Sequence, residues 1–264
     1  TKHFTRKPET TFLIDLDENK NRSNWVLDLG DNISLDLKRI PGGQLTNVAT
    51  GEFADFNNGF WMGQFEITNE QFTRFDPDHD SRLEHGDFLQ FSKEGRGWAL
   101  NQTKQPAVRV SWEKAMAFCE WLSKKTGKQV TLPTFQQWQF ALQTNDKDLE
   151  NDFTLAANLA DESLSNMDSY EFDHPYVVLQ PWRPSIRSVN DGFRVSAPVG
   201  SYRPNQLGLF DMIGNVAEWT LSENSEMKTA VGGSWYDRPH VAFQDNNPNY
   251  FAWQGVYNVG FRIV

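Results

Sequence analysis

Apolar positions recur at helical spacing most clearly in residues 111–127, SWEKAMAFCEWLSKKTG. Four apolar side chains share one face of this stretch: Ala115, Phe118, Cys119 and Leu122. Serine is a residue type that caps helix N-termini, and glycine commonly ends a helix in the left-handed conformation. The pattern therefore predicts a helix capped by Ser111 and ended by Gly127, with its apolar face in a core.

Shorter elements are predicted on both sides of this helix. Short apolar runs alternate with Gly and Asn over residues 36–65, which favours strands and turns. Thr68 is placed to cap a short helix, and a second helix is expected to start at Thr134 and bury Trp138. After that, regular structure is sparse up to a final strand at 259–262. This texture indicates an α+β fold with low regular secondary structure.

The chain of 264 residues has the length of one large domain. Residues 1–35 are polar and charged, with short strand-like islands, and we expect them to form an N-terminal extension packed on the domain. Residues 36–264 hold the other predicted elements and form the domain itself. Its long loops need polar networks or bound ions to fix them.

Composition and charge exclude several classes of partner. The net charge is −10 and no run of Lys and Arg occurs, so we expect neither nucleic acid nor an anionic membrane surface as a partner. No apolar run approaches the ~18 residues of a membrane span. The chain begins at Thr1 without Met, as it would after removal of a signal peptide or in a cloned fragment; we expect an exported protein, periplasmic or extracellular.

Cofactor chemistry is poorly represented among the motifs. Cys119 is the single cysteine, so an internal disulfide and any site that needs two thiolates are excluded. Its place on the apolar helix face predicts an inert core thiol. Gly42-Gly43 and Gly232-Gly233 fit neither a phosphate loop nor a dinucleotide fingerprint, and we expect neither NAD nor haem.

Residues 76–105 form a long polar excursion. Asp76, Asp78 and Asp80 have the alternate spacing of a calcium loop, but Ser81 stands where an EF-hand requires Gly. A solvated acidic loop is the favoured interpretation.

Four stretches, taken in order, resemble the formylglycine-generating enzyme (sulfatase-modifying factor) family: residues 60–72, 105–141, 190–219 and 232–262. The most specific part is PNQLGLFDMIGNVAEW, residues 204–219. The resemblance implies a single compact domain with a variant of the C-type lectin fold. It also implies a site on the final segment, because active members hold copper there with two cysteines that follow Gly-Gly-Ser-Trp/Tyr.

The corresponding stretch of this chain, residues 236–247, contains no cysteine. Copper(I) prefers soft thiolate ligands, so we expect no copper and no formylglycine generation by that mechanism. A sister branch of iron enzymes uses three histidines, whereas the five histidines here are scattered. An oxygen-using oxidoreductase with a non-cysteine metal site stays open as an alternative.

The resemblance also implies two structural calcium ions. The first would be held by the side chains of Asn158 and Asp191 with the carbonyls of Leu159 and Phe193. The second would be held by the side chains of Asp211 and Glu218 with the carbonyls of Gly214 and Val216. Oxygen ligands of this mixture suit calcium. The alternative is that Asp191 belongs to a simple turn and that Asp211 is a cap.

The final segment interleaves aromatic side chains with Asn, Asp and Gln. Adaptable recognition surfaces have this composition, and the residues that we expect to contact a partner are Tyr236, Asp237, His240, Phe243, Asp245, Asn247, Tyr250 and Trp253. The alternative is that half or more of the rings are core, and we expect Trp235 and Phe261 to be so.

Together these observations predict a catalytically inactive, calcium-stabilised family member that binds a protein partner through its C-terminal loops. The resemblance suggests the partner class, because exported bacterial members regulate or neutralise proteins such as toxins, effectors and secretion-system kinases. A periplasmic kinase domain or a toxin is therefore the expected partner. A lectin-like or variable-ligand receptor is a further alternative, since the fold also serves display proteins.

Overall fold

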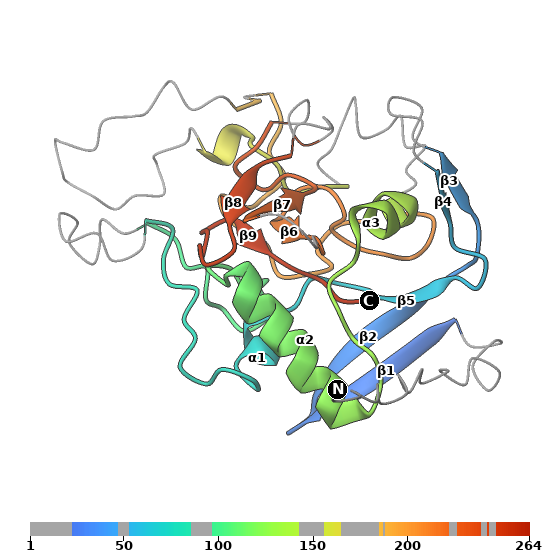
Figure 1. Ribbon diagram of the computed structural model, residues 1–264. Helices are drawn as coiled ribbons and strands as arrows, with labels where there is room; N and C mark the ends of the chain where they lie inside the picture. The colour runs from blue at the N-terminus through green and yellow to red at the C-terminus, as the bar shows by residue number, and fades with distance from the viewer. Residues whose placement is uncertain are drawn as a thin grey trace, which may run out of the picture.

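The computed structural model describes residues 23–46, 53–85, 97–142, 156–164, 185–186, 188–221, 226–238, 242 and 247–264. Short strands and long irregular connections predominate in this part of the chain (Figure 1). Its helices are α1 (Asn69–Phe72), α2 (Trp112–Thr126) and α3 (Phe135–Leu142), with one 3₁₀ turn at Glu162–Leu164. The predicted α+β class with low regular secondary structure is confirmed.

Two larger sheets organise the described strands. The first is antiparallel, in the order β1 (Asn24–Gly30), β2 (Ile33–Ile40) and β5 (Phe60–Gly63). The second has the order β8 (Asn249–Phe251), β7 (Met227–Val231), β6 (Ala217–Trp219) and β9 (Val259–Gly260), with β6 and β9 parallel. A small hairpin pairs β3 (Gln44–Thr46) with β4 (Phe53–Asp55).

The β1–β2 hairpin has a tight turn, and buried side chains alternate with more exposed ones along its strands. Asp31 and Asn32 both have positive φ, of 53° and 61°, as the tight turn that suits the twist of two paired strands requires. The domain boundary expected after residue 35 falls inside β2. The described residues before it, 23–35, therefore pair directly with the rest of the fold. Residues 1–22 lie outside the described residues.

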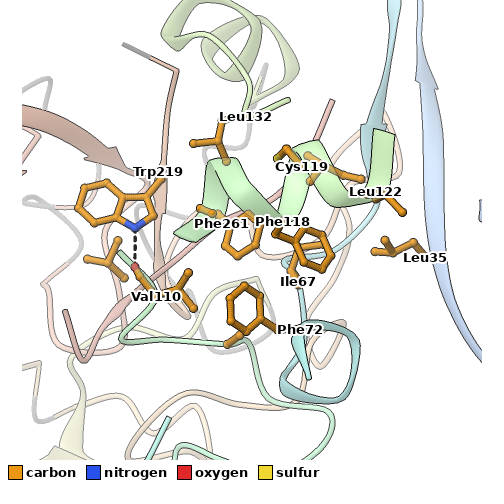
Figure 2. Close-up of a cluster of buried hydrophobic side chains, with 14 of the residues drawn as sticks. Leu35, Ile67, Phe72, Val110, Phe118, Cys119, Leu122, Leu132, Trp219 and Phe261 are labelled. Atoms are coloured by element: carbon orange, nitrogen blue, oxygen red, sulfur yellow. Dashed lines mark hydrogen bonds between the residues drawn. The ribbon is translucent and has the colours of Figure 1, made fainter. Parts of the chain in front are cut away.

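Helix α2 forms as its sequence predicts. The Ser111 side chain accepts the backbone N–H of Lys114, and Gly127 ends the helix in the left-handed conformation with φ of 65°. Four side chains of its apolar face are buried: Ala115, Phe118, Cys119 and Leu122. They pack in one cluster with Phe72 of α1 and with Phe261, which directly follows β9 (Figure 2). Helix α2 is thus the centre of the largest core cluster.

The two shorter helices also confirm their predicted caps. Thr68 and Gln71 exchange side-chain and backbone hydrogen bonds at the start of α1, which forms a capping box. Thr134 and Gln137 do the same before α3. Helix α3 buries Trp138 against a second core cluster.

The described part of the acidic excursion forms internal polar contacts. Asp76 pairs with Lys114 at 2.6 Å, while Asp80 accepts hydrogen bonds from Arg82 and Asn101. Residues 86–96 lie outside the described residues. Among the residues that the structure describes, no group of three or more His, Cys, Asp and Glu side chains could hold a metal ion. In the same residues, no helix is long and apolar enough to cross a membrane.

Candidate functional site

A fully buried guanidinium stands between the two sheets and α3. Arg262 Nε and Nη2 donate to Glu218 at 2.5–2.8 Å, and its remaining donors reach the carbonyls of Gly63 and Phe210. Trp138 Nε1 donates to Glu218 Oε2 at 2.8 Å. Strand β9 runs parallel to β6, and this pairing brings Arg262 beside Glu218. Contacts with Trp138, Gly63 and Phe210 hold the pair in place.

Three buried acidic side chains surround this single guanidinium. Glu66 and Asp211 are buried with Glu218 and interact electrostatically with Arg262. Burial raises the pKa of Glu66 well above its usual value, and the neighbouring carboxylates of Asp211 and Glu218 raise it further. Burial also raises the pKa of Asp211, to about 6. Three buried carboxylates with one guanidinium create a negative potential that a cation would relieve.

The residues expected at the second calcium position lie around this cluster. Asp211 Oδ2 accepts the Gly200 N–H at 2.7 Å, whereas Asp211 Oδ1 is buried and accepts no hydrogen bond from a described residue. Gly214 has φ of 76°, and a Cβ there would lie 2.3 Å from the carbonyl oxygen of Asn158, so only glycine fits. Both Glu218 oxygens are engaged by Arg262 and Trp138, so any ion would share that carboxylate with them.

The first expected calcium position gathers residues from two distant segments. Asp191 accepts the backbone N–H groups of Leu159 and Phe193, both at 3.0 Å. Asn158 Oδ1 is buried without a hydrogen bond from a described residue, while its Nδ2 donates to the Val195 carbonyl. The structure therefore brings Asn158, Leu159, Asp191 and Phe193 together, and leaves one buried oxygen unsatisfied.

Asp161 lies beside this expected position and was not anticipated from the sequence. Its Oδ2 accepts the Asp191 N–H at 2.5 Å, and its Oδ1 accepts the Ser163 N–H. Burial first and then the charge of Asp161 raise the pKa of Asp191 to about 7. The Asp161-x-Ser163 spacing, typical of a side-chain turn, was the available signal. Two carboxylates beside an amide oxygen form a set of hard ligands that fits calcium.

Asn215 connects the two positions. Its Nδ2 donates to both carboxylate oxygens of Glu66 at 3.2 Å, and its Oδ1 accepts from Asn158 Nδ2 and from the Ala197 N–H. Asn215 has φ of 54°, an uncommon conformation that its hydrogen bonds on both sides hold in place. The two sites are thus parts of one buried polar network.

A cavity of about 360 Å³ opens at the C-terminal segment. Four residues expected to contact a partner line it: Tyr236, Asp237, Asn247 and Tyr250. Trp253 lies on the surface instead, with 67% of its area exposed. His240, Phe243 and Asp245 lie outside the described residues. Trp235 and Phe261 are fully buried, as predicted.

Three residues of this site are additional to the expected contact residues: Ser234, Tyr257 and Asn258. Tyr257 and Asn258 line the cavity. Asn258 Nδ2 donates to Ser234 Oγ at 2.9 Å, and the Ser234 hydroxyl donates to Asp237 Oδ2 at 2.7 Å. Burial raises the pKa of Asp237, and the hydrogen bonds from Ser234 oppose that effect. The cavity thus contains a carboxylate supported by a fixed polar chain.

The single cysteine does not contribute to either site. Cys119 lies on the buried face of α2, and burial raises the pKa of its thiol to about 12. A thiol in that environment stays protonated at neutral pH, so it is a poor nucleophile and a poor metal ligand. The predicted core position of Cys119 is confirmed.

A second cavity, of about 440 Å³, lies beside the first expected calcium position and is lined in part by Gly192, Phe193 and Arg194. The Arg194 guanidinium stacks 4.1 Å from the centre of the Trp98 ring at its wall. The contact fixes Arg194 by a cation–π interaction.

Comparisons with known proteins agree with this architecture. The profile of the Sulfatase-modifying factor enzyme 1-like domain matches residues 36–264. The inactive C-alpha-formylglycine-generating enzyme 2 of Bos taurus is 31% identical over 137 residues, which cover 50% of this chain and 39% of that protein. The chaperone protein LppX of Paenibacillus barcinonensis is 23% identical over 276 residues, which cover 88% of this chain and 90% of that protein.

Among solved structures, PvdO from Pseudomonas aeruginosa matches with a TM-score of 0.65 at 20% identity. The match covers 92% of this chain and 98% of PvdO, so the two share their fold over nearly the whole length. Together with the profile, this result confirms the variant of the C-type lectin fold that the resemblance implied. The chain therefore belongs to the family of formylglycine-generating enzymes and sulfatase-modifying factors.

Proposed function

We propose that this chain is a catalytically inactive, calcium-stabilised family member that binds a protein partner around its C-terminal cavity. The observation that carries the proposal is the content of that cavity. Its walls include three tyrosines, Asp237 and two asparagines. Three of these residues, Tyr236, Asp237 and Asn247, fall on residues 236–247, the stretch that by the family resemblance corresponds to the copper thiolates of active members. A cavity without sulfur suits recognition better than copper chemistry. The Bos taurus relative is itself named an inactive enzyme.

An exposed aromatic pair marks the partner surface. Phe251 and Trp253 are 43% and 67% exposed, and their rings stack with centroids 6.0 Å apart and planes 8° apart. Phe251 follows directly on Tyr250, which lines the cavity. Large exposed aromatic side chains beside a pocket are typical of interface hot spots. The name of the LppX relative, a chaperone protein, supports a protein as the ligand.

The partner class follows from the family resemblance. We place the protein outside the cytoplasm, in the periplasm or the extracellular space, where it would neutralise a toxin or effector or regulate a kinase domain. Binding would act by covering the partner's own active site, and no chemistry would be required of this chain.

The partner surface is tested by replacing Trp253 with alanine. After photo-crosslinking from position 253 identifies a partner, that partner is produced in pure form and its affinity is measured by calorimetry. We expect Trp253→Ala to weaken binding by about 30-fold, the effect of losing a hot spot. Phe53→Ala is the matched control, because Phe53 is 61% exposed on β4. An affinity that Trp253→Ala leaves unchanged would exclude this surface.

Calcium is proposed for the two positions because each presents an unsatisfied buried oxygen, Asn158 Oδ1 and Asp211 Oδ1, beside carboxylates. Bound calcium would compensate the excess of negative charge and join segments that are distant in the sequence. Its binding free energy would stabilise the folded state.

Removing calcium with a chelator is expected to destabilise the protein. At a calcium concentration of 100 times Kd, each of the two sites contributes about 2.7 kcal/mol, or roughly 5–10 °C of Tm in a chain of this size, so both ions together raise Tm by about twice that amount. Asp211→Asn should reduce that rise by about half, whereas the exposed control Asp55→Asn should leave it intact. Calorimetry with metal analysis checks both. One equivalent of iron or copper without calcium would instead support the oxidoreductase alternative.

A further inference from the structure

The cavity walls present aromatic rings in fixed orientations. Tyr236 and Tyr257 meet edge to face, with centroids 5.8 Å apart and planes at 86°, and both pack against buried Trp235. Tyr250 packs in the same manner against Trp219, at 5.8 Å and 89°. Rings held from behind lose little entropy when a ligand binds. Tyrosine faces carry negative potential and attract cations.

Two polar groups at the cavity, the Asp237 carboxylate and the Asn258 amide oxygen, are hydrogen-bond acceptors. The single hydroxyl proton of Ser234 is used on Asp237, so Ser234 accepts from Asn258 Nδ2, which fixes the orientation of the Asn258 amide. Asn258 Oδ1 is then buried at the wall and accepts no hydrogen bond from a described residue, so its dipole adds negative potential. Asp237 forms no ion pair within the described part of the chain.

The backbone holds the Asp237 carboxylate in this place. The Asp237 N–H donates to the Ser234 carbonyl, and the Asp237 carbonyl accepts the Ala160 N–H. The described lining residues include no Lys, Arg or His: they are Ala217, Gly233, Tyr236, Asp237, Asn247, Pro248, Tyr250, Val256, Tyr257 and Asn258. An anionic ligand would therefore find no opposite charge there. A purely apolar ligand would bury the carboxylate unpaired, which is costly.

We infer that this cavity receives a lysine or arginine side chain of the protein partner. The inference rests on the proposed function and adds the chemistry of recognition. A volume of about 360 Å³ is small for a drug-sized ligand but sufficient for one long side chain. The methylene stem would lie against the tyrosine rings, and the charged end would reach Asp237. Phe251 and Trp253 would contact the partner beside it. The net charge of −10 favours the approach of a basic partner.

The test uses capped amino acids on the full chain. N-acetyl-lysine methylamide and N-acetyl-arginine methylamide are titrated by NMR against N-acetyl-norleucine methylamide, which has the same stem without the charge. We expect the cationic probes to bind at least about tenfold more tightly. Asp237→Asn and Tyr257→Leu should each remove most of that preference, while the distant control Asp55→Asn should keep it. Melting temperatures establish that every variant is folded.

Three outcomes would overturn the inference: equal binding of norleucine, an unchanged preference in Asp237→Asn, or binding of free butylamine without binding of the capped lysine. The last outcome would indicate a small amine ligand instead of a partner side chain. These failures differ from failure of the proposed function. If Trp253→Ala abolishes partner binding while no cationic probe binds, only the cation site is wrong. If the probes bind while Trp253→Ala leaves the affinity for the partner unchanged, the proposed partner surface is wrong.

Discussion

Replacing Arg262 with methionine is expected to lower the free energy of unfolding by about 3–5 kcal/mol or more. Methionine fills most of the volume but leaves Glu66, Asp211 and Glu218 buried without the guanidinium that now interacts with all three. It also removes donors from the carbonyls of Gly63 and Phe210. A loss of this size is a large fraction of the stability of an ordinary domain. Urea unfolding followed by circular dichroism measures it.

Two further variants make this result specific to the charge balance. Arg203→Met, at an exposed position, should change stability by less than about 0.5 kcal/mol. The double variant Arg262→Met/Glu218→Leu should recover part of the loss, because removing both partners of a buried pair is less costly than removing one. If Arg262→Met is as stable as the parent protein, the Arg262–Glu218 pair does not stabilise the packing of the C-terminal segment against β6.

The helices were accessible from the sequence because their signals are local. Ser111 and Gly127 lie in contact with the helix that they cap and end, and the periodic face between them is read from neighbouring positions alone. The same holds for Thr68, whose capping partner is three residues away. A sequence signal that lies within one helical turn does not depend on how the helix packs in the tertiary structure.

The residues expected to bind calcium followed from the resemblance, but the other side chains that the structure places around them did not. Asp161 and Asp191 are 30 residues apart, and the sequence between them gives no spacing from which their hydrogen bond could be read. Asn215 and Glu66 are 149 residues apart. Such pairs depend on the path by which long, irregular loops return to the core, and no periodic sequence pattern encodes that path.

The sequence indicated the C-terminal site only as a segment, and the structure shows which of its residues line a cavity. Composition drew attention to residues 236–253, yet it could not separate Tyr250, which lines the cavity, from Trp253, which lies on the surface. Ser234 and Asn258 escaped notice because their role is a hydrogen-bond chain across 24 residues. The parallel pairing of β9 with β6 creates that neighbourhood, and parallel pairing is a long-range event.

Replacing Phe118 with alanine should have an effect comparable with that at Arg262, by a different mechanism. Phe118 is fully buried on α2, stacked on Phe72 at 5.6 Å and edge-on to Phe261 at 5.5 Å (Figure 2). It therefore joins α1 to the C-terminal segment that directly follows β9. Truncation leaves a cavity among rigid rings and should cost about 3–5 kcal/mol. The same change at Phe53, which is largely exposed, should cost little, and near-equal losses in urea unfolding would show that this cluster is not the central core.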